Sequence, residues 1–364
     1  MFQYIALLSI LLFLLYIFNP RALAKTSNTS KFAYFSSCGL LMLLSALKAS
    51  TVGNDTPEYV RIFEISPDLE FGLSRYEYGY ILYNKLLYNI SSSPQIVFIC
   101  TSLFVFAGFS RFFWKYSEMP WLSVLFFFLM GKYAFVMSAL RQSIALTILL
   151  FAFESLYYKK YFLFIAFTLF ASTFHGSALL FLICLPLSFI KLNPRFIFLF
   201  ILTSIISLTL FGDILDVALS YVTAYQRYVD GVYFEGETRV ASLLQLSLSV
   251  IILFIGYSSF KKQKGINSYM VILHIVAVYL YVLCLKVNLI DRFAEYFSVF
   301  SLVFLPNAIN KMHIDRKRIT IYTFILYYSI YVGIALVYRP NWNNIYPYNF
   351  FWEEKERLDY IDRD

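Results

Sequence analysis

Charged residues are scarce in this 364-residue chain: Asp, Glu, Lys and Arg make up 14% of it, against roughly 25% in soluble domains. Residues of the AVILMFWYC set make up 60%, which excludes a water-soluble globular protein. The four cysteines fall in apolar runs without the spacing of a zinc or redox motif, so we expect them to be packing residues. With only three histidines we expect no metal site. The net charge of +8 forms no long basic run, so we expect no nucleic-acid binding.

Apolar runs long enough to cross a bilayer recur along the whole chain. A transmembrane helix needs roughly 20 apolar residues, and short spans of about 17 residues occur. We therefore predict an all-α, polytopic integral membrane protein with about 12 transmembrane helices. They cover residues 2–18, 32–47, 95–113, 121–139, 142–158, 161–173, 177–190, 196–211, 241–257, 269–285, 293–309 and 319–337.

The charges of the connectors predict which side of the membrane each connector faces. Most lysines belong to alternate connectors, for example Lys25, Lys115, Lys160, Lys262 and Lys317, and the positive-inside rule places that side in the cytoplasm. Both termini are then expected outside. A cleaved signal peptide in place of the first span is disfavoured, because the positive charges follow the apolar stretch and do not precede it.

The remaining connectors are expected to face outward, and they include the longest ones. We predict a single transmembrane domain over residues 1–338, with large outer loops at 51–94 and 212–240 and an outward-facing tail at 339–364. Pro57 follows an Asn-Asp-Thr sequence that is typical of a helix start. We therefore expect short interfacial helices in the outer loops.

Arg141 is the least ordinary charged residue, because it stands between two apolar runs. A cation in such a place is costly unless it is paired. At the outer start of a helix, its guanidinium joins the positive end of the helix dipole and favours an anion such as phosphate. Arg292, at the start of a later helix, and Arg339 are further candidates for binding phosphate. The alternatives are arginines that anchor helices at the interface, or an ordinary pair between Arg292 and Glu295.

Three residues of the outer connectors are candidates for accepting a proton. His175 lies at a predicted outer turn between two short spans, and an imidazole titrates near neutral pH. Asp55 and Glu77 belong to the first outer loop, near side chains that can stack on a sugar or hydrogen-bond to it. A structural histidine, and an Asp55 that only caps a helix, are the alternatives.

The order of these features resembles the Wzy-type O-antigen and capsular polysaccharide polymerases, specifically their EpsG-like family. The Arg-Gln element followed one hairpin later by a His is the most specific part of the resemblance. The matching stretches are Asn54-Asp55-Thr56 with Tyr59, Glu77-Tyr78, Arg141-Gln142, Phe174-His175, and Arg292 with Tyr296-Phe297.

This resemblance implies a membrane glycosyltransferase with a GT-C-like architecture in the bacterial plasma (inner) membrane. Such an enzyme extends O-antigen, capsule or exopolysaccharide by moving a glycan chain from undecaprenyl pyrophosphate to a lipid-linked repeat unit on the periplasmic, outer face. It implies no cofactor, metal or nucleotide sugar. The expected partners are the lipid-linked oligosaccharide, the lipid bilayer and a protein that regulates chain length.

The resemblance and the chemistry together predict a role for each candidate residue. A pyrophosphate leaving group develops negative charge, which arginines stabilise. Remaining polar side chains would contact the rest of the substrate. The catalytic candidates are His175, Asp55 and Glu77, the pyrophosphate-binding candidates are Arg141, Arg292 and Arg339, and the other substrate-binding candidates are Gln142, Tyr78 and Tyr296.

A flippase or transporter of lipid-linked oligosaccharides, and an O-antigen ligase, are the alternative functions. A transporter predicts internal repeats and charges near the membrane midplane, whereas the sequence contains no repeat and carries its charges near helix ends. A ligase uses the same arginine chemistry with another acceptor, so the sequence does not separate it from a polymerase. A membrane O-acyltransferase would place its histidine toward the cytoplasm, whereas His175 is predicted outside.

Overall fold

The computed structural model describes residues 2–17, 28–69, 76–211, 240–263, 265–338 and 344–353. Helices make up 80% of the structure, and the described ranges contain no β-strand. Lys48 and Phe350 form an isolated antiparallel β-bridge within these ranges. The predicted all-α fold class is confirmed.

The contacts within the chain define two compact units, which are described separately. The first comprises Met1–Leu179 and Met312–Asp364, and the second comprises Leu180–Lys311. The single transmembrane domain expected over residues 1–338 stays a prediction. The outer loop at 212–240 falls almost entirely outside the described residues.

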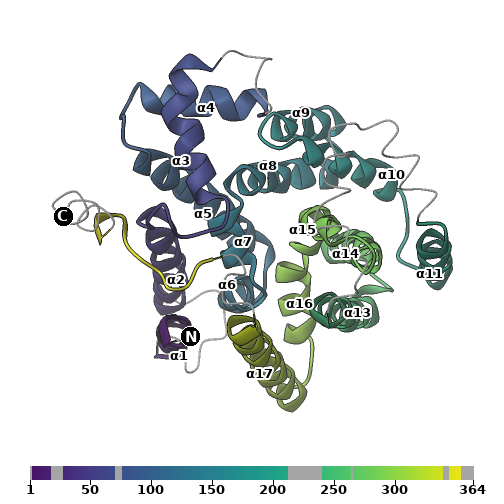
Figure 1. Ribbon diagram of the computed structural model, residues 1–364. Coiled ribbons are helices and arrows are strands. Elements are labelled where there is room, and N and C mark those ends of the chain that lie inside the picture. Colours follow the sequence, from purple (N-terminus) through teal and green to yellow (C-terminus); the bar gives the residue numbers. More distant parts are fainter. Residues whose placement is uncertain are drawn as a thin grey trace. The chain divides into compact units, whose positions relative to one another are not determined.

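The first unit contains most of the described helices (Figure 1). They are α1 (Phe2–Ile17), α2 (Asn28–Ala46), α3 (Thr56–Ile65) with the 3₁₀ turn η1 (Ser66–Asp68), α4 (Tyr78–Tyr88), α5 (Gln95–Tyr116), α6 (Pro120–Leu129), α7 (Lys132–Ser138), α8 (Leu140–Tyr157), α9 (Tyr161–Ser172) and α17 (Ile314–Tyr338). Within this unit α5 packs against both α2 and α8, and α8 packs along α9.

The second unit is built around α14, which packs against most of its neighbours in that unit. The 3₁₀ helix η2 (Gly176–Ile183) leads from the first unit into the second. The others are α10 (Cys184–Leu187), α11 (Pro194–Thr209), α13 (Val240–Phe260), α14 (Ile266–Leu283), η4 (Asn288–Ile290), α15 (Asp291–Ser298) and α16 (Ser301–Asn310).

Each apolar segment predicted from the sequence coincides with a helix or with two successive helices. The segment 121–139 forms α6 and α7, which are bent by 62° at Gly131. Gly131 has a φ of 73°, which residues with a side chain rarely adopt. Among the described residues, four helices, α5, α8, α13 and α14, are long and apolar enough to cross a membrane, and there is a fifth if the bent α6–α7 pair is one span. The count of 12 spans stays a prediction.

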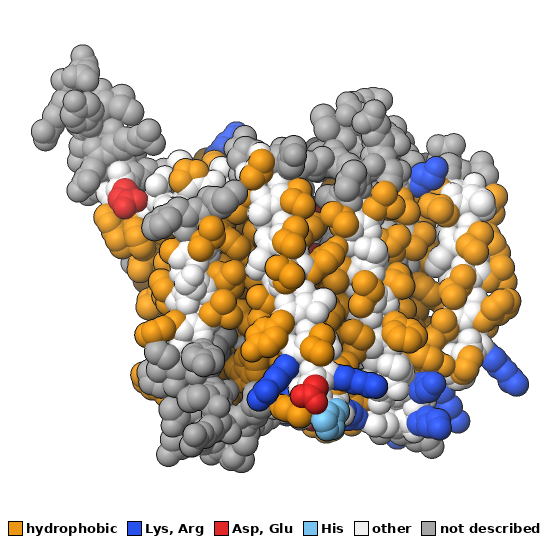
Figure 2. All heavy atoms as spheres, turned by 90° about the horizontal axis from the view of Figure 1, so that it is seen from below, with side chains coloured by type: hydrophobic (Ala, Val, Ile, Leu, Met, Phe, Trp, Pro, Cys, Tyr) orange, Lys and Arg blue, Asp and Glu red, His pale blue; other side chains and the backbone are white. Residues whose placement is uncertain are grey.

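Hydrophobic side chains cover the middle of the helices seen in Figure 2, whereas lysine and arginine side chains gather toward helix ends. Many large apolar residues of the described helices are exposed in the structure, for example Phe162 of α9 at 82% and Phe254 of α13 at 70%. In water such a surface is unfavourable, and in a bilayer it contacts lipid tails. The arrangement indicates a membrane protein.

The predicted short helices of the first outer loop are present as α3 and α4, which pack against each other. Tyr59, Ile62 and Phe63 of α3 share a buried face, as their spacing predicts. Asp55 occupies the N-cap position of α3 without a side-chain hydrogen bond to the helix. The Asp55 side chain is therefore not used as a cap of α3.

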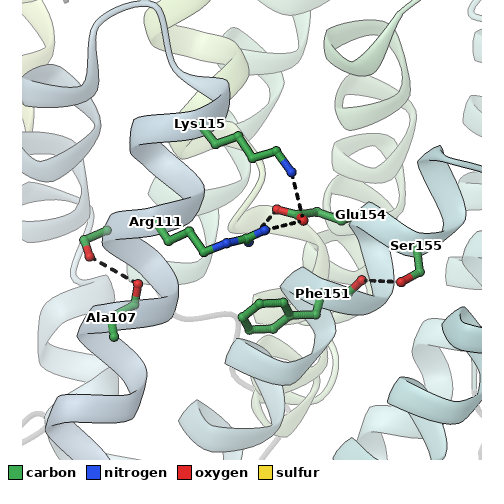
Figure 3. A network of polar contacts seen from close by, with 7 residues as sticks. Ala107, Arg111, Lys115, Phe151, Glu154 and Ser155 are labelled. Carbon is green, nitrogen blue, oxygen red and sulfur yellow. Dashed lines mark hydrogen bonds and ion pairs between the residues drawn. The ribbon is translucent and has the colours of Figure 1, made fainter.

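A charged network joins α5 to α8 at one end of the pair (Figure 3). Arg111 donates two hydrogen bonds to the Glu154 carboxylate, of 2.7 and 2.8 Å, and Lys115 donates a third of 3.1 Å. Two cations thus neutralise a carboxylate whose side chain is only 10% exposed. Arg141 belongs to the first turn of the same helix α8. At 1.5 Å per residue the Cα atoms of Arg141 and Glu154 are roughly 20 Å apart, so α8 carries a separate polar cluster at each end.

Candidate functional site

Three of the residues predicted from the sequence form one polar cluster in the first unit. The Arg141 guanidinium donates through Nη1 to Oε2 of Glu77. On the other side of the same carboxylate, Oε1 of Glu77 lies 3.5 Å from Nδ1 of His175 and accepts a 3.0 Å hydrogen bond from the backbone N–H of Gly176. The side chains of Arg141, Glu77 and His175 are 20 to 24% exposed, so the cluster is partly buried but reachable.

The helix order explains why residues distant in sequence meet here. A short turn joins α8 to α9, so the two helices are antiparallel and the end of α9 lies beside the start of α8. Arg141 is in the first turn of α8, and His175 comes just after α9. Glu77 precedes α4 in extended conformation, with φ of −66° and ψ of 141°, which is typical of an N-cap residue.

A close backbone contact docks the start of α4 onto the end of α9. The Thr173 carbonyl accepts hydrogen bonds from the N–H of Gly79, at 2.8 Å, and from the N–H of Tyr80, at 3.2 Å. A Cβ at position 79 would collide with Thr173, approaching its Cβ to 2.8 Å and its carbonyl oxygen to 2.9 Å. Only glycine allows this approach, which places Glu77 beside His175.

Gly79→Ala is expected to push α4 away from α9 and to destabilise the first unit. Overpacking of a close contact typically costs about 1–3 kcal/mol, so the melting temperature of the purified protein in detergent should fall. Gly39→Ala is the matched control, because a Cβ there meets nothing within 4 Å. Equal melting temperatures for the two variants would contradict this account of the α4–α9 contact.

Tyrosine rings surround the guanidinium of Arg141. Its central carbon lies 5.5 Å from the ring centroid of Tyr76 and 5.9 Å from that of Tyr80, distances at which a cation interacts with an aromatic face. Tyr59 in turn packs its ring edge-on against Tyr80 with centroids 5.9 Å apart. These contacts, together with Glu77, compensate a cation at the start of an apolar helix.

Several polar atoms of the cluster are buried without a hydrogen-bond partner among the described residues. They are Nε of Arg141, Nδ1 of His175 and the hydroxyl of Tyr80. Buried polar atoms without a partner are rare and call for a ligand, a water molecule or a catalytic role. They are concentrated around one arginine, which makes this cluster the candidate functional site of the first unit.

The electrostatics of Glu77 are set by its three partners. Burial raises the pKa of the Glu77 carboxyl, but the nearby His175, the charge of Arg141 and the N–H of Gly176 outweigh this effect and lower the pKa to about 2. Glu77 is therefore an anion at neutral pH and a weak proton acceptor. This arrangement suits a group that orients Arg141 and His175.

Two further predicted site residues adjoin the cluster in sequence, and three others belong to the second unit or lie outside the described residues. Gln142 follows Arg141 in α8 and is buried, and Tyr78 begins α4 beside Glu77 with 58% of its surface exposed. Arg292 and the buried Tyr296 belong to α15 of the second unit. Arg339 lies outside the described residues. Within the described part of the chain, no three His, Cys, Asp or Glu side chains gather as metal ligands would.

Lys48 is not among the residues predicted from the sequence. Its side chain is fully buried next to the loop that carries Asp55, and its ammonium donates to the carbonyl of Val52 at 3.1 Å and to Oγ1 of Thr56 at 2.9 Å. It also donates to the carbonyl of Met137. A lysine at the end of an apolar helix is an ordinary interface anchor by sequence, so only the fold reveals these three bonds.

All three residues of the cluster lie within the part of the chain that matches a known family. Neither the curated proteins nor the solved structures contain a match. The EpsG family matches residues 31–350 of the chain, a stretch that includes Glu77, Arg141 and His175. Because the match covers most of the sequence, the chain belongs to the EpsG family, which indicates a membrane polymerase of polysaccharide biosynthesis.

Proposed function

We propose that this chain is a metal-independent glycosyltransferase that polymerises the repeat units of a surface polysaccharide. It would transfer the growing glycan from undecaprenyl pyrophosphate to a lipid-linked repeat unit at the outer face of the plasma membrane. The observation that carries the proposal is the cluster of Arg141, Glu77 and His175 at one end of an apolar helix. Lipid-linked substrates require a site that opens near the membrane, where this cluster is expected.

Arg141 suits the binding of the leaving pyrophosphate. In the reaction an acceptor hydroxyl attacks the anomeric carbon of the donor, the bond from that carbon to the phosphate oxygen breaks, and negative charge develops on the pyrophosphate. Nη1 of Arg141 is held by Glu77, whereas its Nε has no hydrogen-bond partner among the described residues. The guanidinium thus keeps a donor for a phosphate oxygen, and the N-terminus of α8 adds its positive dipole.

His175 suits the acceptance of the acceptor proton. Glu77 lies on the Nδ1 side of its ring, so a carboxylate there orients the imidazole and leaves Nε2 for a sugar hydroxyl. Glu77, with its pKa of about 2, acts in this proposal by orienting its two neighbours. Asp55, at the start of α3 in the same unit, is the alternative base.

Further substrate contacts complete the proposal. The exposed ring of Tyr78 next to Glu77 offers a surface on which a sugar can stack, and Gln142 adjoins Arg141. Arg292 and Arg339 are proposed as additional phosphate contacts. Tyr296, which belongs to the second unit, is proposed as a further contact with the substrate. A GT-C-like architecture with 12 spans, and a partner protein that sets chain length, belong to the same proposal.

Reconstitution of the purified chain in liposomes tests the function. Given lipid-linked repeat units as the only glycan source, and with EDTA present, we expect longer lipid-linked chains and released undecaprenyl pyrophosphate. Nucleotide sugars are not needed, because the donor is already activated. Movement of intact lipid-linked units across the bilayer without lengthening would identify a flippase instead. Transfer only to a different, non-repeat acceptor would identify a ligase.

A further inference from the structure

Lys48 is a buried lysine that none of the roles described above uses, and burial lowers its pKa to about 7. It follows α2, has no exposed surface, and lies 4.9 Å from the ring centroid of Phe98 on α5. Its Nζ has three acceptors within reach, Val52 O, Thr56 Oγ1 and Met137 O, which match the three protons of its charged form. A fully buried amino group with three hydrogen bonds fixes the groups around it.

These bonds join the outer loop after α2 to the break between α7 and α8. Val52 and Thr56 belong to the loop and to α3, whereas Met137 lies in the last turn of α7. A second bond crosses the same boundary, from the N–H of Asn54 to Oγ of Ser138 at 3.1 Å. The loop is thereby fastened to α7 immediately before α8 begins.

Gly53 shows how close this contact is. Its φ is 103°, and a Cβ there would come within 2.5 Å of Oγ1 of Thr56 and 3.0 Å of the Met137 carbonyl oxygen. The loop therefore approaches the end of α7 with no room for a side chain. The hydrogen bond from Lys48 and the close approach of Gly53 both involve the carbonyl of Met137 at the end of α7.

The break that Lys48 fastens determines where Arg141 points. Ala139 ends α7 and precedes α8, with φ of −107° and ψ of 66°, outside both the helical and the extended regions. Arg141 is two residues further on, so a change at Met137 or Ala139 rotates the first turn of α8. Its guanidinium would then lose its alignment with Glu77.

We propose that Lys48 is a positioning residue for the Arg141 site: its ammonium holds the α7–α8 break in the conformation that aims Arg141 at Glu77. This inference rests on the proposed function, because its test measures the rate of glycan transfer. Lys48 touches no substrate in this account and acts through the backbone at Met137.

Steady-state kinetics of reconstituted Lys48→Met test this inference. We expect kcat to fall at least 10-fold with KM for the lipid-linked donor within twofold of wild type, because a misaimed guanidinium loses an interaction made in the transition state. Glu154→Gln is the matched control, since it removes a buried charge at the other end of α8 and should lower the melting temperature without a comparable fall in kcat. Rates are compared below the melting temperature of each variant.

A double-mutant cycle separates positioning from general destabilisation. In an Arg141→Lys background, Lys48→Met should lower kcat by less than twofold, because both changes act on one contact. Equal fold-losses in the wild-type and Arg141→Lys backgrounds would overturn the proposal. If Lys48→Met does not accumulate, Thr56→Val removes one of the three acceptors and should lower kcat about threefold, whereas an unchanged kcat would also overturn it.

The outcomes distinguish a failure of this inference from a failure of the proposed function. If Arg141 variants lose polymerisation while Lys48→Met keeps the wild-type kcat, the function stands and the positioning role is wrong. If Arg141→Lys itself polymerises normally, the proposed function of the site is wrong, and the positioning role falls with it.

Discussion

Replacing Arg141 by lysine is expected to slow glycan transfer about 100-fold or more, and replacing it by alanine still further. Removing one preorganised donor to a developing oxyanion typically costs about 10²–10³ in rate. Lysine keeps the charge, but its N–H groups radiate from one nitrogen and lack the planar, fixed spacing with which the guanidinium would bond Glu77 through Nη1 and a phosphate oxygen through Nε. Single-turnover rates with a purified lipid-linked donor measure the effect.

The control for this prediction is the same change in the charged network between α5 and α8. Arg111→Lys alters a guanidinium of α5 that bonds Glu154, a residue whose Cα lies roughly 20 Å from that of Arg141 along α8. Its transfer rate should stay within threefold of wild type. An Arg141→Lys rate within the same threefold range would mean that Arg141 is a structural anchor.

Glu77→Gln is expected to lower both activity and stability. The amide keeps the shape of the carboxylate but loses the charge that holds Arg141 and His175 on its two sides. Loss of a partner that orients a functional side chain typically lowers activity by about 10- to 100-fold. Breaking a partly buried ion pair costs about 1–3 kcal/mol of folding free energy. Transfer rates and melting temperatures at pH 7 measure the two effects.

The pH dependence of the Glu77→Gln effect has a definite sign. The pKa of Glu77 is lowered in the folded protein from 4.5 to about 2, so its contribution to stability is complete above pH 4.5 and is lost as the pH falls toward 2. The difference in melting temperature between wild type and Glu77→Gln should therefore shrink between pH 5 and pH 3. A difference that stays constant over this range would show that Glu77 is not held as an anion by its neighbours.

The helices could be predicted from the sequence because apolar runs in a membrane protein coincide with them. The run at 121–139 nevertheless folds as two helices, since Gly131 adopts a left-handed conformation and Lys132 follows it at the bend. Both residues are visible in the sequence, but a count of apolar residues over the whole run does not detect the break that they make. The helix α3 of the first outer loop was predicted from the helix-start sequence that ends at Pro57.

The candidate site was only partly predictable. Arg141 and His175 stand out in sequence because each interrupts an apolar context. Glu77 was chosen as a possible base among sugar-binding residues, but its contact with Arg141 crosses 64 residues of sequence, and no local pattern encodes such a contact. Lys48 escaped notice for the same reason, since its bond to Met137 crosses 89 residues.

A gel of the surface polysaccharide tests the central claim most directly. A host that lacks the gene would carry wild type, Arg141→Lys or Arg111→Lys at matched membrane abundance. The account predicts that Arg141→Lys leaves single repeat units at the surface without the long-chain ladder, while Arg111→Lys keeps the ladder. A normal ladder with Arg141→Lys would contradict the assignment of this site, and loss of every repeat unit, single ones included, would point to a flippase or a ligase.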